Sequence, residues 1–208
     1  MDSANKTTKN KEELKVRIIE TANKLFSSKG IKAVHMDEIA NELSISKRTL
    51  YELFTDKENL LLQCVIAHQQ IKRIHLQKIA EQTMNPLELV LNIYKHGMNE
   101  LPNVDIRFLE DIKRYPAIME LLAKQREEET ERALHFYKKG VEKGVFRADI
   151  KFEMFHRLMN FGMDGYLKSN LLEEYPLTDI FDTLVKVYMR GICTTDGIAY
   201  LENFLNKN

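Results

Sequence analysis

The sequence predicts an all-α fold, in which three short N-terminal helices precede a larger helical bundle. Apolar residues recur every three or four positions nearly throughout the 208 residues, which is the period of a helix with one buried face. Only eight glycines and four prolines interrupt this pattern, and no strand-like alternation persists beyond a few residues. No repeat of about 34 or 40 residues is present, which argues against a helical solenoid.

The first helix is expected to begin at Asn10, because Asn10 and Glu13 have the spacing of a capping box. Gly30 is expected to end it as the residue after the last turn. One face of the helix carries the apolar side chains Leu14, Ile18, Ala22, Leu25 and Phe26. Residues 1–9 are polar and lack the apolar core of a signal peptide, so we expect a flexible polar tail there.

Two short helices are expected next, over residues 36–43 and 47–53, and the turn Ser-Ile-Ser joins them. Ser46 is expected to cap the second of these helices. Thr55 and Glu58 have the spacing of another capping box, which would open a long fourth helix to about residue 80.

Turn residues divide the rest of the chain into further helices. Asn85 followed by Pro86 is typical of an N-cap with proline at the first helical position. Gly144 marks a turn within residues 142–150. The expected helices lie over residues 86–100, 104–114, 116–143, 151–172 and 178–193, with a last short one after Gly197.

Two short helices joined by a three-residue turn have the layout of a helix-turn-helix. Together with the first helix, the inward side chains would form a three-helix core. They are Ile39, Ala40, Leu43, Ile45, Leu50 and Phe54. With Leu50 and Phe54 turned inward, the third helix keeps two cations and a tyrosine on its outer face.

An exposed first turn of this kind can place hydrogen-bond donors against the base edges and phosphates of duplex DNA. Lys57, near the start of the fourth helix, would add a phosphate contact next to the N-terminal amides of that helix. The candidate DNA-binding residues on this reasoning are Ser46, Lys47, Arg48, Thr49, Tyr51 and Lys57.

The overall charge gives no support to this interpretation. Lysine and arginine together number 31, as do aspartate and glutamate, and the first 60 residues carry 11 cations against 10 acids. A nucleic-acid partner would therefore have to bind a local patch. The alternative is that Lys47 and Arg48 are simply solvated and that Tyr51 is half-buried in packing.

The segment IIETANKLFSSKGIKAVHMDEIANELSISKRTLYELFTDKENLL, about 45 residues long, resembles the N-terminal domain of the tetracycline-repressor (TetR) family of bacterial transcription regulators. The matching features are Ala22, Phe26, Gly30, DEIA at 37–40, Ser46, TLY at 49–51, Phe54 and DKENLL at 56–61. The resemblance implies a homodimeric regulator, most simply a repressor, that binds a palindromic operator and is released by a small-molecule effector.

The resemblance also assigns roles along the chain. It implies a helix-turn-helix DNA-binding domain over residues 10–57 and a ligand-binding and dimerisation domain over residues 58–208. The positions of Tyr51 and Lys57 are typically phosphate contacts in the family, and those of Lys47–Thr49 supply contacts that differ among members.

Two positions depart from the family pattern. The resemblance adds His35 to the candidate DNA-binding residues; it stands where the family usually has Thr or Ser to cap the second helix, so its phosphate contact is expected to be weaker than usual. Ser44 stands where the turn usually has glycine, and a positive φ there would cost on the order of 1 kcal/mol.

In the family, two late helices pair with their symmetry mates in a four-helix dimer interface. The resemblance places these helices near residues 151–172 and 178–193, where glycines would permit close approach. The candidate interface residues are Phe155, Gly162, Tyr166, Leu184, Tyr188 and Gly191. Apolar stripes do not declare their partners, so packing of both faces within one subunit stays an alternative.

Nine methionines and ten phenylalanines suit an adaptable, largely apolar ligand pocket. Its candidate lining is Tyr94, Met98, Phe108, Met119, Phe136 and Met159, although an ordinary core uses the same residue types. His68 and His75 lie seven apart on one helical face, but a metal needs three or four converging ligands, so neither a metal nor a cofactor is expected.

Rival classes are an all-helical enzyme and an interaction adaptor that does not bind DNA. No paired carboxylates, nucleophile–base spacing or phosphate loop can be recognised, so we expect no enzyme. Cys64 and Cys193 lie far apart within apolar helical patterns, as reduced, buried thiols do. With no apolar run of about 18 residues, the sequence predicts a soluble, cytoplasmic protein.

Overall fold

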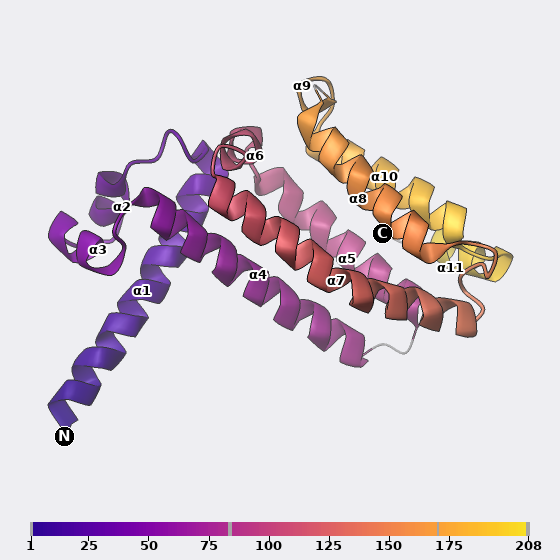
Figure 1. The fold of residues 1–208 in the computed structure, drawn as a ribbon, viewed down its shortest axis with the longest axis horizontal. Helices are drawn as coiled ribbons and strands as arrows, with labels where there is room; N and C mark the ends of the chain where they lie inside the picture. Colours follow the sequence, from indigo (N-terminus) through magenta and orange to yellow (C-terminus); the bar gives the residue numbers. More distant parts are fainter. Residues whose placement is uncertain (1, 83–84, 170, 207–208) are drawn as a thin grey trace. The chain divides into compact units, whose positions relative to one another are not determined.

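The computed structural model describes the backbone of residues 2–82, 85–169 and 171–206 (Figure 1). The described part of the chain is helical apart from turns and one isolated bridge between Phe146 and Cys193, which confirms the predicted all-α class. The helices are α1 (Asp2–Lys29), α2 (Met36–Glu42), α3 (Lys47–Leu53), α4 (Lys57–Gln82), α5 (Pro86–Glu100), the 3₁₀ turn η1 (Leu101–Asn103), α6 (Ile106–Ile112), α7 (Pro116–Glu142), α8 (Phe152–Lys168), α9 (Leu171–Glu174), α10 (Leu177–Ile192) and α11 (Thr195–Leu205).

The chain forms two compact units. The first comprises Met1–Arg73 and Asn103–Leu121, and the second Ile74–Pro102 and Leu122–Asn208. The first unit therefore extends beyond the helix-turn-helix segment expected over residues 10–57, because α6 packs with α1.

The core of the first unit is the predicted three-helix core, enlarged by the start of α4. Ile39, Ala40, Leu50 and Phe54 are buried as expected, whereas Leu43 and Ile45 are only partly buried. Apolar side chains of α1, of the following loop and of α4 complete the core: Ile18, Ala22, Phe26, Ile31, Val34, Leu60, Leu61 and Cys64.

Several helix starts differ from the sequence prediction, those of α1, α4 and α11 among them. Helix α1 begins at Asp2 rather than Asn10, so residues 2–9 are helical where a flexible tail was expected. Neither glycine nor proline occurs before Gly30, so nothing in the sequence stops the helix from extending toward the N-terminus.

The capping box expected at Thr55 and Glu58 was wrong by one position. Asp56 accepts a hydrogen bond from the amide of Asn59 at 2.7 Å and so caps α4 itself. At the other end of the chain, α11 begins before Gly197 rather than after it, because the Thr194 hydroxyl accepts from the Gly197 amide at 3.1 Å.

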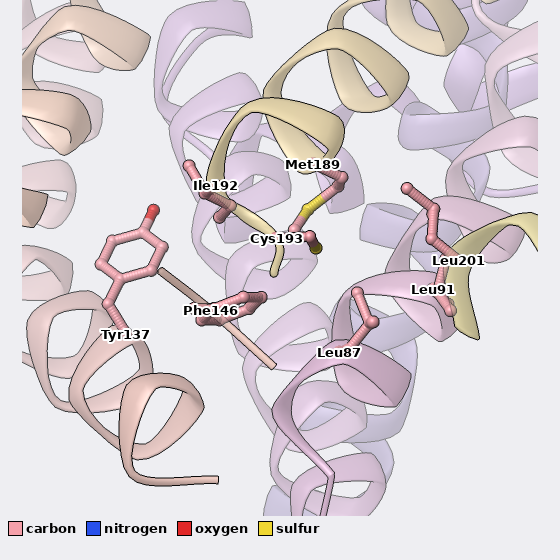
Figure 2. Packing of buried hydrophobic residues seen from close by; sticks show 8 residues of the cluster. All are labelled: Leu87, Leu91, Tyr137, Phe146, Met189, Ile192, Cys193 and Leu201. Atoms are coloured by element: carbon pink, nitrogen blue, oxygen red, sulfur yellow. The ribbon is translucent and has the colours of Figure 1, made fainter. Parts of the chain in front are cut away.

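The second unit has its own apolar core, built where α5, α7, α10 and α11 converge on the turn after α7 (Figure 2). Phe146 lies across Gly140, where a Cβ would come within 1.9 Å of its ring. The amide of Arg147 donates to Ile192 at 2.8 Å, and the Thr194 hydroxyl donates to Gly144 at 2.7 Å. The turn is thereby fixed to the α10–α11 junction.

Candidate nucleic-acid interface

The turn between α2 and α3 is a Schellman motif. The Ile45 amide donates to Ala40 at 2.9 Å and the Ser44 amide donates to Asn41 at 3.0 Å, which closes the end of α2. Ser44 takes the left-handed residue of this motif with φ 55°. The expected positive φ is confirmed, and the strain of a non-glycine residue sits inside the candidate site.

The first turn of α3 is capped by Ser46, as predicted. The Ser46 hydroxyl accepts from the Thr49 amide at 3.0 Å, and the two hydroxyls of Ser46 and Thr49 lie 2.8 Å apart. Leu50 is fully buried beneath them. This arrangement fixes how α3 is rotated about its axis and turns the other side of the helix to solvent.

The outer face of α3 carries the two predicted cations and the tyrosine. The side chains of Lys47 and Arg48 are 63% and 88% exposed, and Tyr51 is 48% exposed. Lys47 pairs with Asp37 of α2, and Arg48 Nε lies 2.8 Å from Glu52. The hydrogen bond to Glu52 raises the pKa of Arg48. Both ion pairs are exposed and therefore weak, so a phosphate or a base edge can replace the carboxylates.

His35 precedes α2 as the N-cap residue, but its side chain makes no capping hydrogen bond, as the sequence departure suggested. The first turn of α2 instead carries Asp37 and Glu38. Glu38 pairs with Lys29 at 2.5 Å, and this hydrogen bond lowers the pKa of Glu38. Two carboxylates in the first turn already face the N-terminal end of α2, so their negative charge makes that end less favourable to a phosphate.

Lys57 is placed differently from the other candidates. Its ammonium donates to the carbonyls of Ile31 at 2.7 Å and Val34 at 2.8 Å, with that of Lys32 at 3.4 Å. Burial lowers the pKa of Lys57, and the nearby carboxylate of Asp111 opposes that shift. The three N–H groups of the ammonium thus have acceptors within the protein. Sequence reasoning missed this role, because backbone carbonyls leave no mark in a sequence.

The candidate dimer residues lie on α8 and α10, in the second unit. Phe155 and Tyr188 pack edge to face with ring centroids 5.6 Å apart, and Leu184 is partly buried. A Cβ on Gly162 would lie 3.1 Å from the Tyr188 hydroxyl, whereas one on Gly191 would meet nothing within 4 Å. The side chain of Tyr166 lies outside the described residues.

The same two helices expose an apolar surface, which we call the α8/α10 face. Its large, solvent-exposed side chains are Met154, Leu158, Phe161 and Val187. A hollow of about 480 Å³ also lies here, lined by Gly162 and Gly165 of α8, Leu171 and Tyr175, and Ile180 and Leu184 of α10.

The six candidate pocket residues are divided between the two units. Phe108 and Met119 belong to the first unit, and Tyr94, Met98, Phe136 and Met159 to the second, so neither unit by itself holds the set. Two of the six have packing roles in the second unit.

Tyr94 joins α5 to α10. Its ring stacks on Phe181 at 6.0 Å, and its hydroxyl donates to Asp182 at 2.5 Å. Burial, with the Asp182 carboxylate, raises the pKa of Tyr94 to about 12. Phe136 packs against Phe146 with centroids 5.6 Å apart. Both side chains thus support the core of the second unit.

The described residues offer few other potential sites. The described residues include no group of three or more His, Cys, Asp or Glu side chains that could hold a metal. His75 lies against His96, with ring centroids 4.8 Å apart. Cys64 and Cys193 are buried free thiols, and burial raises their pKa to about 12 and about 11. No helix in the described ranges has both the length and the apolar character needed to cross a bilayer.

The three-helix core, the Schellman turn and the exposed face of α3 define a helix-turn-helix protein. Residues 18–64 match the family model described as bacterial regulatory proteins, tetR family. The predicted resemblance is confirmed.

Relatives support the same assignment. An HTH-type transcriptional regulator of Staphylococcus aureus (strain USA300) is 33% identical over 82 residues, which are 39% of this chain and 44% of that protein. The match therefore spans less than half the length of that relative.

Solved structures extend the likeness to the fold of most of the chain. A putative transcriptional regulator from Saccharomonospora viridis, in complex with choline, has a TM-score of 0.71 at 18% identity and covers 88% of this chain and 99% of its own. A TetR-family regulator from Agrobacterium tumefaciens has a TM-score of 0.71 at 12% identity, over 88% of this chain and all of the other. At these identities the likeness is one of fold.

Proposed function

We propose that this protein is a DNA-binding transcriptional regulator, a repressor that binds a palindromic operator as a homodimer and leaves it when a small molecule binds. The observation that carries the proposal is the outer face of α3, where Lys47, Arg48 and Tyr51 are exposed above the buried Leu50. A helix held in this way can enter the major groove with its first turn against the bases.

The groups on α3 divide by the reach of their side chains. Lys47 and Arg48 read base edges or adjacent phosphates once their carboxylate partners Asp37 and Glu52 are displaced. Tyr51 contacts a phosphate through its hydroxyl. Ser46 and Thr49 fix the first turn of α3 and present their hydroxyls at its edge. His35 is the N-cap residue of α2, and its side chain makes no capping hydrogen bond, so we propose that it reaches a phosphate.

A single helix-turn-helix with so small an excess of cations binds DNA weakly, so useful affinity needs two linked half-sites. We propose that the α8/α10 face supplies the link by pairing with its symmetry mate. Support comes from its large exposed apolar side chains, which a monomer would leave in water. To meet successive major grooves, the two copies of α3 in the dimer must lie about 34–36 Å apart, one turn of DNA.

The effector is proposed to bind in the second unit and to favour a dimer with different spacing. It releases the operator by its differential affinity for the two dimer forms. The richness of the chain in methionine and phenylalanine suits a largely apolar molecule. One regulator with this fold was crystallised with choline, which shows that a small organic molecule can occupy such a fold. Because its operator is genomic, the regulator acts in the bacterial cytoplasm.

A mobility-shift titration with the DNA upstream of the protein's own gene tests the proposal. Wild-type protein should bind this DNA more tightly than a shuffled duplex, and the double variant Lys47→Ala/Arg48→Ala should lose that preference. Lys138→Ala is the matched control, because Lys138 is an exposed lysine paired with an i+4 glutamate on α7. Absence of binding to this DNA and to duplexes selected from the whole genome would reject the function in favour of an enzyme or an adaptor.

A further inference from the structure

The loop between α1 and α2, residues 30–35, leads into α2 without a side-chain cap from its last residue, His35. Helix α1 ends at Lys29 and is followed by Gly30, which has φ +83°; α2 begins after His35, whose side chain does not cap it. Ile31 and Val34 are fully buried, so the backbone of this loop runs close to the core. Polar groups of a buried backbone need partners, and here they come from outside the loop.

Lys57 holds the loop from the start of α4. Its ammonium lies among the carbonyls of Ile31, Lys32 and Val34, at 2.7, 3.4 and 2.8 Å. Hydrogen bonds from a charged donor are about twice as strong as neutral ones, and three acceptors around one ammonium define its position closely.

Asp111 holds the same loop from α6. It is 8% exposed, and its carboxylate accepts from the Lys32 amide at 2.6 Å. Helix α6 is itself docked beside the end of α1. The Asp105 amide donates to Ser27 at 2.7 Å, and a Cβ on Gly30 would come within 2.9 Å of the Arg107 Cβ. Two helices of the first unit therefore hydrogen-bond the backbone of this loop: α4 through Lys57, which donates to its carbonyls, and α6 through Asp111, which accepts from its amide.

We propose that Lys57 and Asp111 are positioning residues for DNA recognition, and that Lys57 acts by holding the 30–35 loop rather than by contacting a phosphate. The proposal rests on the proposed DNA-binding function. The loop leads directly into α2, and the Schellman turn ties α2 to α3. A displaced loop therefore displaces the helix that enters the groove.

The salt dependence of binding separates the two roles of Lys57. A phosphate contact contributes about one unit to the slope of log affinity against log salt, and a positioning residue contributes none. Lys57→Ala should weaken operator binding by on the order of tenfold, since it leaves buried carbonyls without a donor, and leave the slope unchanged. Lys47→Ala, which removes a cation from the exposed face of α3, should flatten the slope.

Lys57→Arg sharpens the comparison. A phosphate accepts a guanidinium as readily as an ammonium, so a phosphate role predicts retained affinity. The planar fork cannot reproduce three donors directed at the 31, 32 and 34 carbonyls, so the positioning role predicts a loss close to that of Lys57→Ala. A flattened slope in Lys57→Ala, or full affinity in Lys57→Arg, overturns the proposal for Lys57.

Amide hydrogen exchange of the full-length protein without DNA tests the loop independently of function. The Lys32 amide should be protected in the wild type, exchange faster in Asp111→Ala, and stay largely protected in Asp111→Asn, whose amide oxygen can still accept. Operator affinity should follow the same order. Equal Lys32 exchange in wild type and Asp111→Ala overturns the role of Asp111. If the exchange results hold but no variant or wild type binds DNA, the proposed function fails and the positioning of the loop stands.

Discussion

Phe161 offers the most direct test of the dimer, because its side chain is 81% exposed in the single chain. In the proposed dimer each Phe161 on the α8/α10 face would be buried against the partner. Burying a phenylalanine side chain contributes roughly 1.5–3 kcal/mol, and two copies leave water at once. Phe161→Ala should therefore weaken dimerisation by about 3–6 kcal/mol, which is roughly 10²- to 10⁴-fold in the dimer dissociation constant.

The same substitution should leave the folded single chain intact. Phe161 makes little contact within its own subunit, and alanine is the better helix former at an exposed position of α8. Circular dichroism should show unchanged helix content, while sedimentation velocity should show monomer at concentrations where wild type is dimeric. Operator affinity should fall along with the dimer fraction.

Ile71→Ala is the control. Ile71 is a large apolar side chain of α4 that is 66% exposed, and it belongs to the first unit, whereas the α8/α10 face belongs to the second. It should not change the subunit state. If Phe161→Ala is as dimeric as wild type across the concentration range, the interface lies elsewhere. If wild type is monomeric both free and on DNA, the two-half-site mechanism itself is refuted.

Three further predictions concern separate parts of the molecule. Arg48→Ala should alter sequence preference at one base pair by ~1–3 kcal/mol, measured by titrating single-base operator variants, and equal weakening on every variant would show that Arg48 only positions the protein. Ser44→Gly should stabilise the protein by roughly 0.5–1 kcal/mol in urea unfolding, because it relieves the left-handed φ of 55° at some cost in unfolded-chain entropy, whereas Ser28→Gly within α1 should destabilise it. Burial raises the pKa of Asp182, but hydrogen bonds from Lys186 and Tyr94 outweigh burial, so the pKa is lowered overall. The ionised carboxylate therefore stabilises the fold above the unfolded pKa of about 4, and this stabilisation is lost as the pH falls through the lowered folded pKa. Asp182→Asn should therefore flatten the acid limb of the stability–pH curve, and an unchanged limb would remove Asp182 from that role.

Local patterns made several elements of both units predictable. The residues of α3, the Ser46 cap and the Asn85–Pro86 start of α5 follow from groups within a few positions of one another, and each is confirmed. The positive φ at Ser44 could be foreseen from the resemblance, because the family usually has glycine at this position of the turn. Local chemistry and local geometry agree at these positions, which is typical of a sequence that specifies one structure.

The interactions that could not be predicted join residues far apart in the chain. The Lys32 amide and Asp111 are 79 positions apart, and Lys57 lies 26 positions from Ile31. In each pair one partner is a backbone group, which is the same at every residue and leaves no pattern. The near miss at Thr55 has a related cause, since Asp56 offers a competing cap one residue later and only the backbone path decides between them.

The surroundings of the glycines could not be predicted from the sequence either. Sequence alone does not show what would surround a side chain at Gly97, Gly140 or Gly191. In the structure, Phe181 fills the space at Gly97 and Phe146 that at Gly140, whereas a Cβ on Gly191 would meet nothing within 4 Å. Gly191 lies on α10 one turn from the exposed Val187, within the α8/α10 face. The space at Gly191 is open, and the apolar side chains beside it are exposed. A second subunit would fill such a space and cover such side chains. We therefore expect a substitution at Gly191 to affect assembly, and substitutions at Gly97 and Gly140 to affect folding.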